Sequence, residues 1–292
     1  MGGYSARYHA ASLAAVFLAL AIGILIGVGF GDDVVSGTTE DLEESLQNDV
    51  ERARERTDEL SRELNRERAF GDAVYPALVG GELRGERVGL IALGALSDEI
   101  ADEVAAAIEP AGARLAQVAV VREPPDLGAL ADQLRDTPYS RLRRDRDDLF
   151  DFARAAGRGL VLGDGVVRRV RAQLLSRFSG RSRAVDAVVV AREAPDELER
   201  EDAEVNETFE DGLLDGIADA GRPVVGAERT DAERSSIELF ESHDISTVDD
   251  IDLIAGRVAL VSVLTGAEGS FGVKDTADEL LPDLIRLAGG ER

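Results

Sequence analysis

The sequence contains no cysteine, no tryptophan, one lysine (Lys274) and one methionine (Met1). Without thiols the chain has no disulfide, no cysteine-ligated zinc or iron–sulfur site and no cysteine nucleophile. Basic residues are also scarce, because 33 lysines and arginines stand against 58 acids and give a formal net charge of −25. A phosphate backbone binds to a basic protein face, so we do not expect nucleic acid as a partner.

The longest apolar stretch lies near the N-terminus and carries no charge over residues 10–30. At ~1.5 Å per residue, this stretch covers about 31 Å, the thickness of the hydrocarbon core of a bilayer. Arg7 precedes it and acids follow it, which predicts a cytoplasmic segment at 1–9, a transmembrane anchor at 10–31 and an extracytoplasmic remainder. The alternative is a cleaved signal peptide, whose apolar region is usually shorter, ~7–15 residues.

Three glycines recur every four residues in the expected anchor: Gly23, Gly27 and Gly31. This double G-x-x-x-G pattern lets two membrane helices approach closely, so we hypothesise that the anchor forms a homodimer. The alternative is that these glycines have no such role, since glycine is common in membrane helices.

Residues 36–70 follow as a proline-free, highly charged segment that predicts a helical stalk. Apolar or small residues recur there at alternating spacings of four and three, a heptad pattern that predicts a short coiled coil. The seam consists of Leu46, Val50, Ala53, Thr57, Leu60 and Leu64. The alternative is a single exposed helix with ion pairs between residues four apart.

From residue 71 to 292 the pattern predicts one α/β domain with a mostly parallel sheet and helices on both faces. Five apolar runs predict buried strands, at 88–93, 115–121, 187–191, 223–227 and 258–264. Helices are expected at 98–108, 127–135, 141–155, 166–178, 203–220, 231–242 and 276–287. Residues 160–163 are ambiguous between a short strand and the start of a helix.

The sequence carries no motif of a known catalytic centre. The turns after the expected strands contain neither the three glycines of a dinucleotide-binding loop nor a P-loop, and no G-x-S-x-G occurs. His9 and His243 are the only histidines. We therefore expect a protein that is not an enzyme and has no cofactor, with His243 as the one candidate metal ligand in the head.

Acids are densest just before the last expected strand. The group consists of Ser246, Thr247, Asp249, Asp250 and Asp252. Its carboxylates could present oxygens to a hard cation, or the hydroxyls and carboxylates could cap a tight turn. The glycine-rich residues 266–273 that follow are expected to form a lid or a plain connector.

Two stretches resemble the actinobacterial copper-transport family MctB. They are residues 9–31, with the glycine repeat, and residues 245–252, with the Gly-Arg-Val at 256–258 and the Phe-Gly-Val at 271–273. The resemblance implies copper transport or efflux and copper homeostasis at the outer cell envelope. It also implies an adaptor role, because related members are partners of a division protein in the cytoplasmic membrane.

Copper chemistry fits the residues of this chain poorly. Cu(I) prefers thiolate and thioether ligands, and Met1 is the only sulfur-bearing residue. The single histidine of the head cannot form a multi-imidazole Cu(II) site. A copper role is therefore implied by the family resemblance alone. Two functions remain open. One is a copper role carried by an oligomer or a partner, and the other is a dimeric scaffold that links a membrane partner to the cell wall or the division machinery.

The glycine repeat makes the first prediction. Replacing Gly23 and Gly27 by isoleucine should weaken association of the isolated anchor segment, because the larger side chains hold the two backbones apart. A membrane two-hybrid assay measures this association. Unchanged association would remove the anchor as a dimer contact.

Overall fold

The computed structural model describes residues 6–193 and 198–283, without the side chains of residues 6–10 and 28–45. The chain divides into two compact units, residues 1–67 and 68–292. In its described part the first unit is one continuous helix, and the second unit is an α/β domain that we call the head.

Helices and strands alternate along the head. The chain contains α1 (Ala6–Val79), β1 (Arg87–Gly94), α2 (Asp98–Ile108), β2 (Arg114–Val121), α3 (Leu127–Gln133), α4 (Arg146–Leu162), α5 (Gly165–Leu174), β3 (Leu175–Gly180), β4 (Ala187–Glu193), α6 (Arg200–Ala218), β5 (Val224–Ala227), α7 (Ile237–Glu241), β6 (Ser246–Val248), α8 (Ile254–Leu264) and β7 (Ser270–Phe271).

Helix α1 contains the expected anchor and stalk. Gly23 and Gly27 have no atom of the described chain within 4 Å of a Cβ placed on them, whereas Gly31 lies in the part of α1 whose side-chain surroundings are not described. The side chains of the heptad seam are exposed, with Leu60 65% exposed. None of the helices searched in the described part of the chain has the length and apolar character that a membrane crossing requires. The side chains of residues 10 and 28–31 of the expected anchor are not described.

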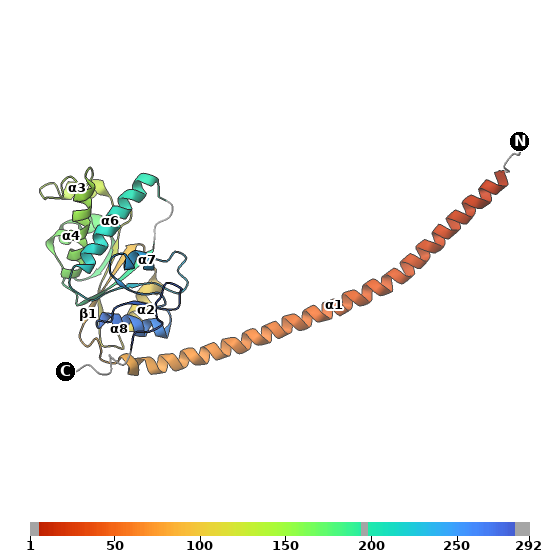
Figure 1. Cartoon of the computed structure of the whole chain (residues 1–292), viewed down its shortest axis with the longest axis horizontal. Coiled ribbons are helices and arrows are strands. Elements are labelled where there is room, and N and C mark those ends of the chain that lie inside the picture. Colours follow the sequence, from red (N-terminus) through yellow and green to blue (C-terminus); the bar gives the residue numbers. More distant parts are fainter. Residues whose placement is uncertain (1–5, 194–197, 284–292) are drawn as a thin grey trace. The chain divides into compact units, whose positions relative to one another are not determined.

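The head is built on a seven-stranded sheet with the strand order β3-β2-β1-β4-β5-β6-β7 (Figure 1). Every neighbouring pair is parallel except β2 with β3, which is antiparallel. The predicted α/β class and mostly parallel sheet are confirmed. Four of the five expected strands are present as β1, β2, β4 and β5.

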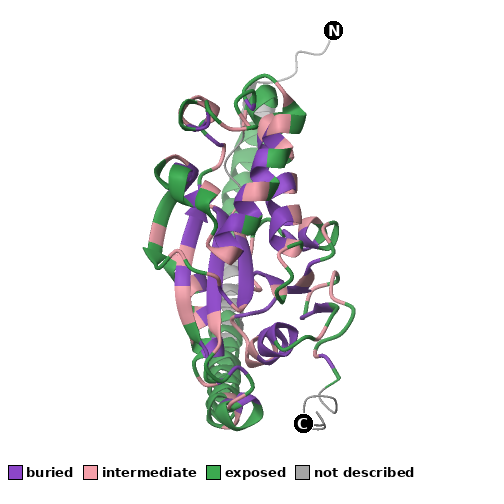
Figure 2. Ribbon diagram, turned by 90° about the vertical axis from the view of Figure 1, so that its left-hand side faces the viewer, coloured by how far each residue is buried: buried purple, intermediate pink, exposed green. Residues whose placement is uncertain are grey.

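Helices cover both faces of the sheet. One core joins alternate strand residues such as Ile91 and Val190 to α4, α5 and α6. The other core joins the intervening residues to α2, α8 and the end of α1, where Tyr75 donates a hydrogen bond to the Ala107 carbonyl at 2.7 Å. Figure 2 shows the resulting layer of buried strands between helices. A strand buried on both faces needs apolar side chains at successive positions, which explains the continuous apolar runs.

The expected strand at 258–264 is wrong, because this segment is the second half of α8. All its residues are buried, so the helix has no polar face and no helical periodicity in its sequence. A short apolar run of this kind cannot be told from a buried strand by its pattern.

Other elements differ from the expectation in the less apolar parts of the head. The helix expected at 166–178 ends at Leu174 and continues as the exposed edge strand β3, and the helix at 231–242 shrinks to α7. Helix α4 extends over residues 160–162 and ends at Gly163, whose φ is 74°. Residues 276–283 are not helical, and 284–287 lie outside the described residues. Strands β6 and β7 are too short to give a pattern of alternation.

Helices α4 and α6 approach each other through glycines. A Cβ on Gly157 of α4 would overlap the Leu213 carbonyl oxygen, and one on Gly216 of α6 would overlap the Arg154 carbonyl oxygen. The two backbones are therefore in direct contact. Any side chain at these positions must separate the helices and disturb the core beneath them.

Replacing Gly157 by alanine should consequently destabilise the head by about 1–3 kcal/mol, because the packed core cannot take up the extra methyl group. Chemical denaturation with helical circular dichroism measures the loss. Gly165→Ala is the matched control, since Arg168 at 3.8 Å is the only side chain near the added methyl. Equal stability of the two variants would show that the helices separate without cost.

Candidate functional site

The strand order places a topological switch point between β1 and β4. From β1 the chain moves outward to β2, whereas from β4 it moves in the opposite direction through β5, β6 and β7. Because the connecting segments diverge there, the carboxyl ends of β1 and β4 open into a crevice, which is where open α/β sheets bind their ligands. We therefore take this end of the sheet as the candidate site.

A pocket of about 550 Å³ occupies this position. It is lined by the start of α2 (Ser97, Glu99, Ile100), the end of β4 (Arg192, Glu193) and the segment after β5 (Glu228, Arg229, Asp231, Ala232, Glu233, Arg234). The Glu193 carboxylate accepts a hydrogen bond from the Ser97 amide at 2.8 Å, which ties α2 to β4. Five acids and three arginines line the pocket, so acids outnumber arginines there.

A buried polar cluster lies at the same end of the sheet. It consists of Glu123 after β2, Arg192 at the end of β4, and Asn206 and Glu210 of α6. Arg192 donates from Nε to Oε1 of Glu210 at 2.7 Å, and their side chains are 18% and 7% exposed. Both carboxyl oxygens of Glu123 and the amide oxygen of Asn206 are buried and accept no hydrogen bond from the described residues.

This environment keeps Glu123 protonated. Burial and, after it, the negative charge of Glu210 raise the pKa of the Glu123 carboxyl to about 9, although Arg192 opposes the shift. At neutral pH a protonated Glu123 therefore lies beside the ion pair of Glu210 and Arg192. The charges of Glu210 and Arg192 cancel, and Glu123 holds a titratable proton in the protein interior.

The acidic group predicted from the sequence is in place, but its members face different partners. Ser246 and Thr247 lie in β6, not at a helix start, and Thr247 is 2.7 Å from the Ser270 hydroxyl of β7. Asp249 accepts the amides of Val273 at 2.8 Å and Lys274 at 3.1 Å. The carboxylate therefore fixes the loop after β7, and the glycine-rich segment at 266–273 contains a strand of the sheet.

Asp250 and Asp252 diverge from Asp249. Asp252 accepts the amide and hydroxyl of Thr230 at 2.8 and 2.7 Å, which holds the loop after β5. Asp250 is fully buried, and neither of its oxygens has a partner among the described residues. Burial raises the pKa of Asp250 to about 7, with smaller contributions from Asp249 and Asp252. The three carboxylates thus do not converge on one point.

Lys274 closes this end of the sheet. Its Nζ donates to Glu228 at 2.6 Å and to the Arg229 carbonyl at 2.8 Å, and the Glu228 side chain is 6% exposed. Glu228 also accepts the Ser236 amide at 2.8 Å. The sequence reasoning missed this contact, although a single lysine in an arginine-rich chain was a signal for a site that needs a point charge.

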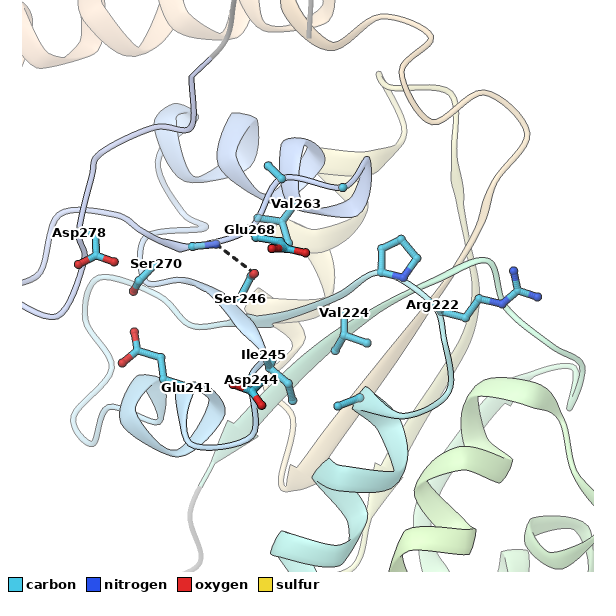
Figure 3. Close-up of a pocket in the computed structure, with 15 residues that line it drawn as sticks. Arg222, Val224, Glu241, Asp244, Ile245, Ser246, Val263, Glu268, Ser270 and Asp278 are labelled. Carbon is cyan, nitrogen blue, oxygen red and sulfur yellow. Dashed lines mark hydrogen bonds between the residues drawn. The ribbon is translucent and has the colours of Figure 1, made fainter. Parts of the chain in front are cut away.

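A second pocket, of about 650 Å³, lies at the opposite end of β5 and β6 (Figure 3). Figure 3 shows Glu241, Asp244, Glu268 and Asp278 around it, with Arg222 at its edge. Ser246 accepts a hydrogen bond from the Gly269 amide at 3.1 Å, which fixes one wall. The lining is mainly acidic and lies away from the switch point.

Comparison with protein families decides the identity. A family model described as copper transport outer membrane protein, MctB, matches residues 4–282. The chain belongs to the MctB family. A comparison with curated proteins finds no match. The match confirms the resemblance seen at the two ends of the sequence and supports a copper-transport-related protein of the cell envelope.

The head offers few ligands for the copper binding that is expected of an MctB protein. His243 is 9% exposed and lies between two carboxylates of α6, with Nδ1 2.7 Å from Asp215 and Nε2 3.3 Å from Asp211. Both ring nitrogens therefore have protein partners. Within the described ranges, no three or more histidine, aspartate or glutamate side chains are grouped so that they could hold a metal ion.

The buried cluster of this MctB protein makes a pH prediction. Because the folded pKa of Glu123 is raised, the folded state holds a proton that the unfolded state loses above about pH 4.3, so stability falls as pH rises from there to about 9. Glu123→Gln removes this titration and should flatten the fall, by at most about 1.4 kcal/mol per pH unit.

Denaturant unfolding at pH 5 and pH 8 measures this difference, with the exposed Glu109→Gln as the matched control. The Glu123 variant should gain stability over wild type at pH 8 and little at pH 5. An equal gain at both pH values would contradict a raised pKa of Glu123 in the folded state.

Proposed function

We propose that this protein is an anchored envelope protein that serves copper transport and homeostasis, with its head as a non-catalytic binding and assembly module. Family membership supports the copper role. The uncharged residues 10–30 and the positive Arg7 before them support an anchor at 10–31, a cytoplasmic N-terminus and an extracytoplasmic head.

One observation carries the assignment of the head: three of its buried carboxylates are bound to the protein itself, whereas the unpartnered Glu123 and Asp250 belong to no group of the described residues that could hold a metal ion. Asp249 holds two backbone amides, Glu228 holds Lys274, and Glu210 holds Arg192. A carboxylate that is bound to a backbone amide or to a cation of the protein must lose this partner before it can ligate a metal. We therefore assign copper movement to an assembly or a partner, and not to a site inside the head.

The second candidate function is a dimeric scaffold that joins a membrane partner to the cell wall or the division machinery. The exposed seam of α1 favours it, because Leu46, Val50, Leu60 and Leu64 are each at least 46% exposed on one unpaired stripe. A second copy of the chain would bury this stripe as a coiled coil. Anchoring both chains in one membrane would raise their local concentration and assist pairing.

Copper titration of the full-length protein in detergent tests the assignment. In competition with a chromophoric chelator, we expect no stoichiometric retention of Cu(I) or Cu(II), and no change in His243→Ala, because soft ligands are missing and His243 is engaged. His9→Ala is the matched control. High-affinity binding lost only in the His243 variant would make the head the copper site.

Copper content of cells separates the two functions. A strain without the protein should accumulate copper if the family role holds, and the His243→Ala protein should restore the normal level. Unchanged copper content, together with capture of a defined membrane partner by pull-down, would favour the scaffold.

A further inference from the structure

A cavity of about 340 Å³ lies at the amino end of β1 and β2, away from both pockets described above. Its lining, which we call the arginine cavity, consists of Arg87, Arg114, Leu115, Ala116, Gly180, Arg181, Arg183, Ala184 and Val185. Four arginines and no acid line the cavity, in a chain with a net charge of −25.

Sheet register brings these arginines together from the first residues of β1 and β2 and the turn after β3. Arg87 and Arg114 are direct partners in the parallel ladder of β1 and β2. The antiparallel pairing of β2 with β3 sets Gly180 opposite Gln117, so Arg181 continues beside the start of β2. Like charges placed opposite each other in a sheet repel, and Asp186 offsets this repulsion only at Arg87.

The backbone around the cavity is fixed. Gly180 has a φ of 92°, and a Cβ on it would overlap the Ala116 carbonyl oxygen. A larger residue would push the turn at 181–183 away from β2. The Arg183 amide donates to the Arg181 carbonyl at 2.8 Å, which tightens this turn. The guanidinium groups thus start from a preorganised backbone.

Three of the four arginines have no internal counter-ion. Arg87 is held by Asp186, with Nε and Nη2 bonds of 2.9 and 2.8 Å. In the part of the chain that the structure describes, no ion pair involves Arg114, Arg181 or Arg183. The other charges that act here are Glu86 on Arg87 and Arg222 on Asp186. A net positive charge is left, in contrast to the acid-rich pockets elsewhere.

We propose that the arginine cavity is a binding site for a phosphate-class oxyanion. The planar guanidinium fork matches phosphate oxygens and forms strong charge-assisted hydrogen bonds with them. The volume lies near the lower end of small-ligand pockets, which are about 300–1,000 Å³. A free phosphate compound and the phosphate headgroup of a lipid present the same chemistry to the site.

Isothermal titration of the full-length protein in zwitterionic detergent with inorganic pyrophosphate tests the site. Arg114→Gln, Arg181→Gln or Arg183→Gln should each weaken binding by roughly tenfold, because each removes a charged hydrogen bond. The matched control replaces Arg158, Arg168 and Arg169 by glutamine, and should bind as wild type does. Chloride at equal ionic strength corrects for screening.

Two further measurements keep the test decisive. Without any anion, the triple glutamine variant of the cavity should be at least as stable as wild type, because like-charge repulsion is relieved. Anionic phospholipid added to the micelles should compete with pyrophosphate if the source is a headgroup, and should leave its binding unchanged if the source is a free compound. Absent pyrophosphate and lipid binding, or equal binding by the cavity and control variants, would overturn the proposal.

Discussion

The pairing of β1 with β4 is the constraint on which the head depends. Both strands are buried on both faces, so they accept only apolar side chains between Val88 and Leu93 and between Ala187 and Ala191. Chain segments leave this pair in opposite directions, which forces the carboxyl ends to open into a crevice. The polar residues at the end of β4, Arg192 and Glu193, therefore line the same pocket as the start of α2 after β1.

Charge is distributed differently at the two ends of the sheet. At the carboxyl ends, Asp249, Glu210 and Glu228 are buried and bound to amides, to Arg192 or to Lys274, so their charges hold loops in place. At the amino ends of β1 and β2, four arginines line one cavity, and only Arg87 has a counter-ion, Asp186, among the described residues. A chain with a large net negative charge thus contains a local positive region. The net charge is a sum over all charged residues and does not give their positions.

A family role in copper transport and a head without soft ligands are compatible if the head binds partners and not the metal. Buried polar groups in such a module specify one arrangement of loops. The protonated Glu123 is a group of this kind, because its raised pKa results mainly from burial, with the charge of Glu210 of α6 as the next cause.

Sequence patterns predicted the elements whose side chains divide clearly between core and solvent. Helix α2 has the predicted bounds because Ser97 caps it and Ile100, Val104 and Ala107 line one face. The same reasoning failed for α8, where burial on all sides removes the pattern, and for β3, an exposed edge strand that reads as the end of a helix. The acidic group at 246–252 lies in β6 and just after it, and its partners Val273 and Thr230 could not be foreseen from the sequence.

The sequence by itself determined the α/β class, the central strands, the shortage of soft metal ligands and the family, since these follow from composition, local pattern and end motifs. Tertiary structure alone decided which charges meet. The Glu123 cluster joins β2, β4 and α6, and the arginine cavity joins β1, β2 and β3. Strand order and register set these contacts, and both depend on packing between segments far apart in the chain.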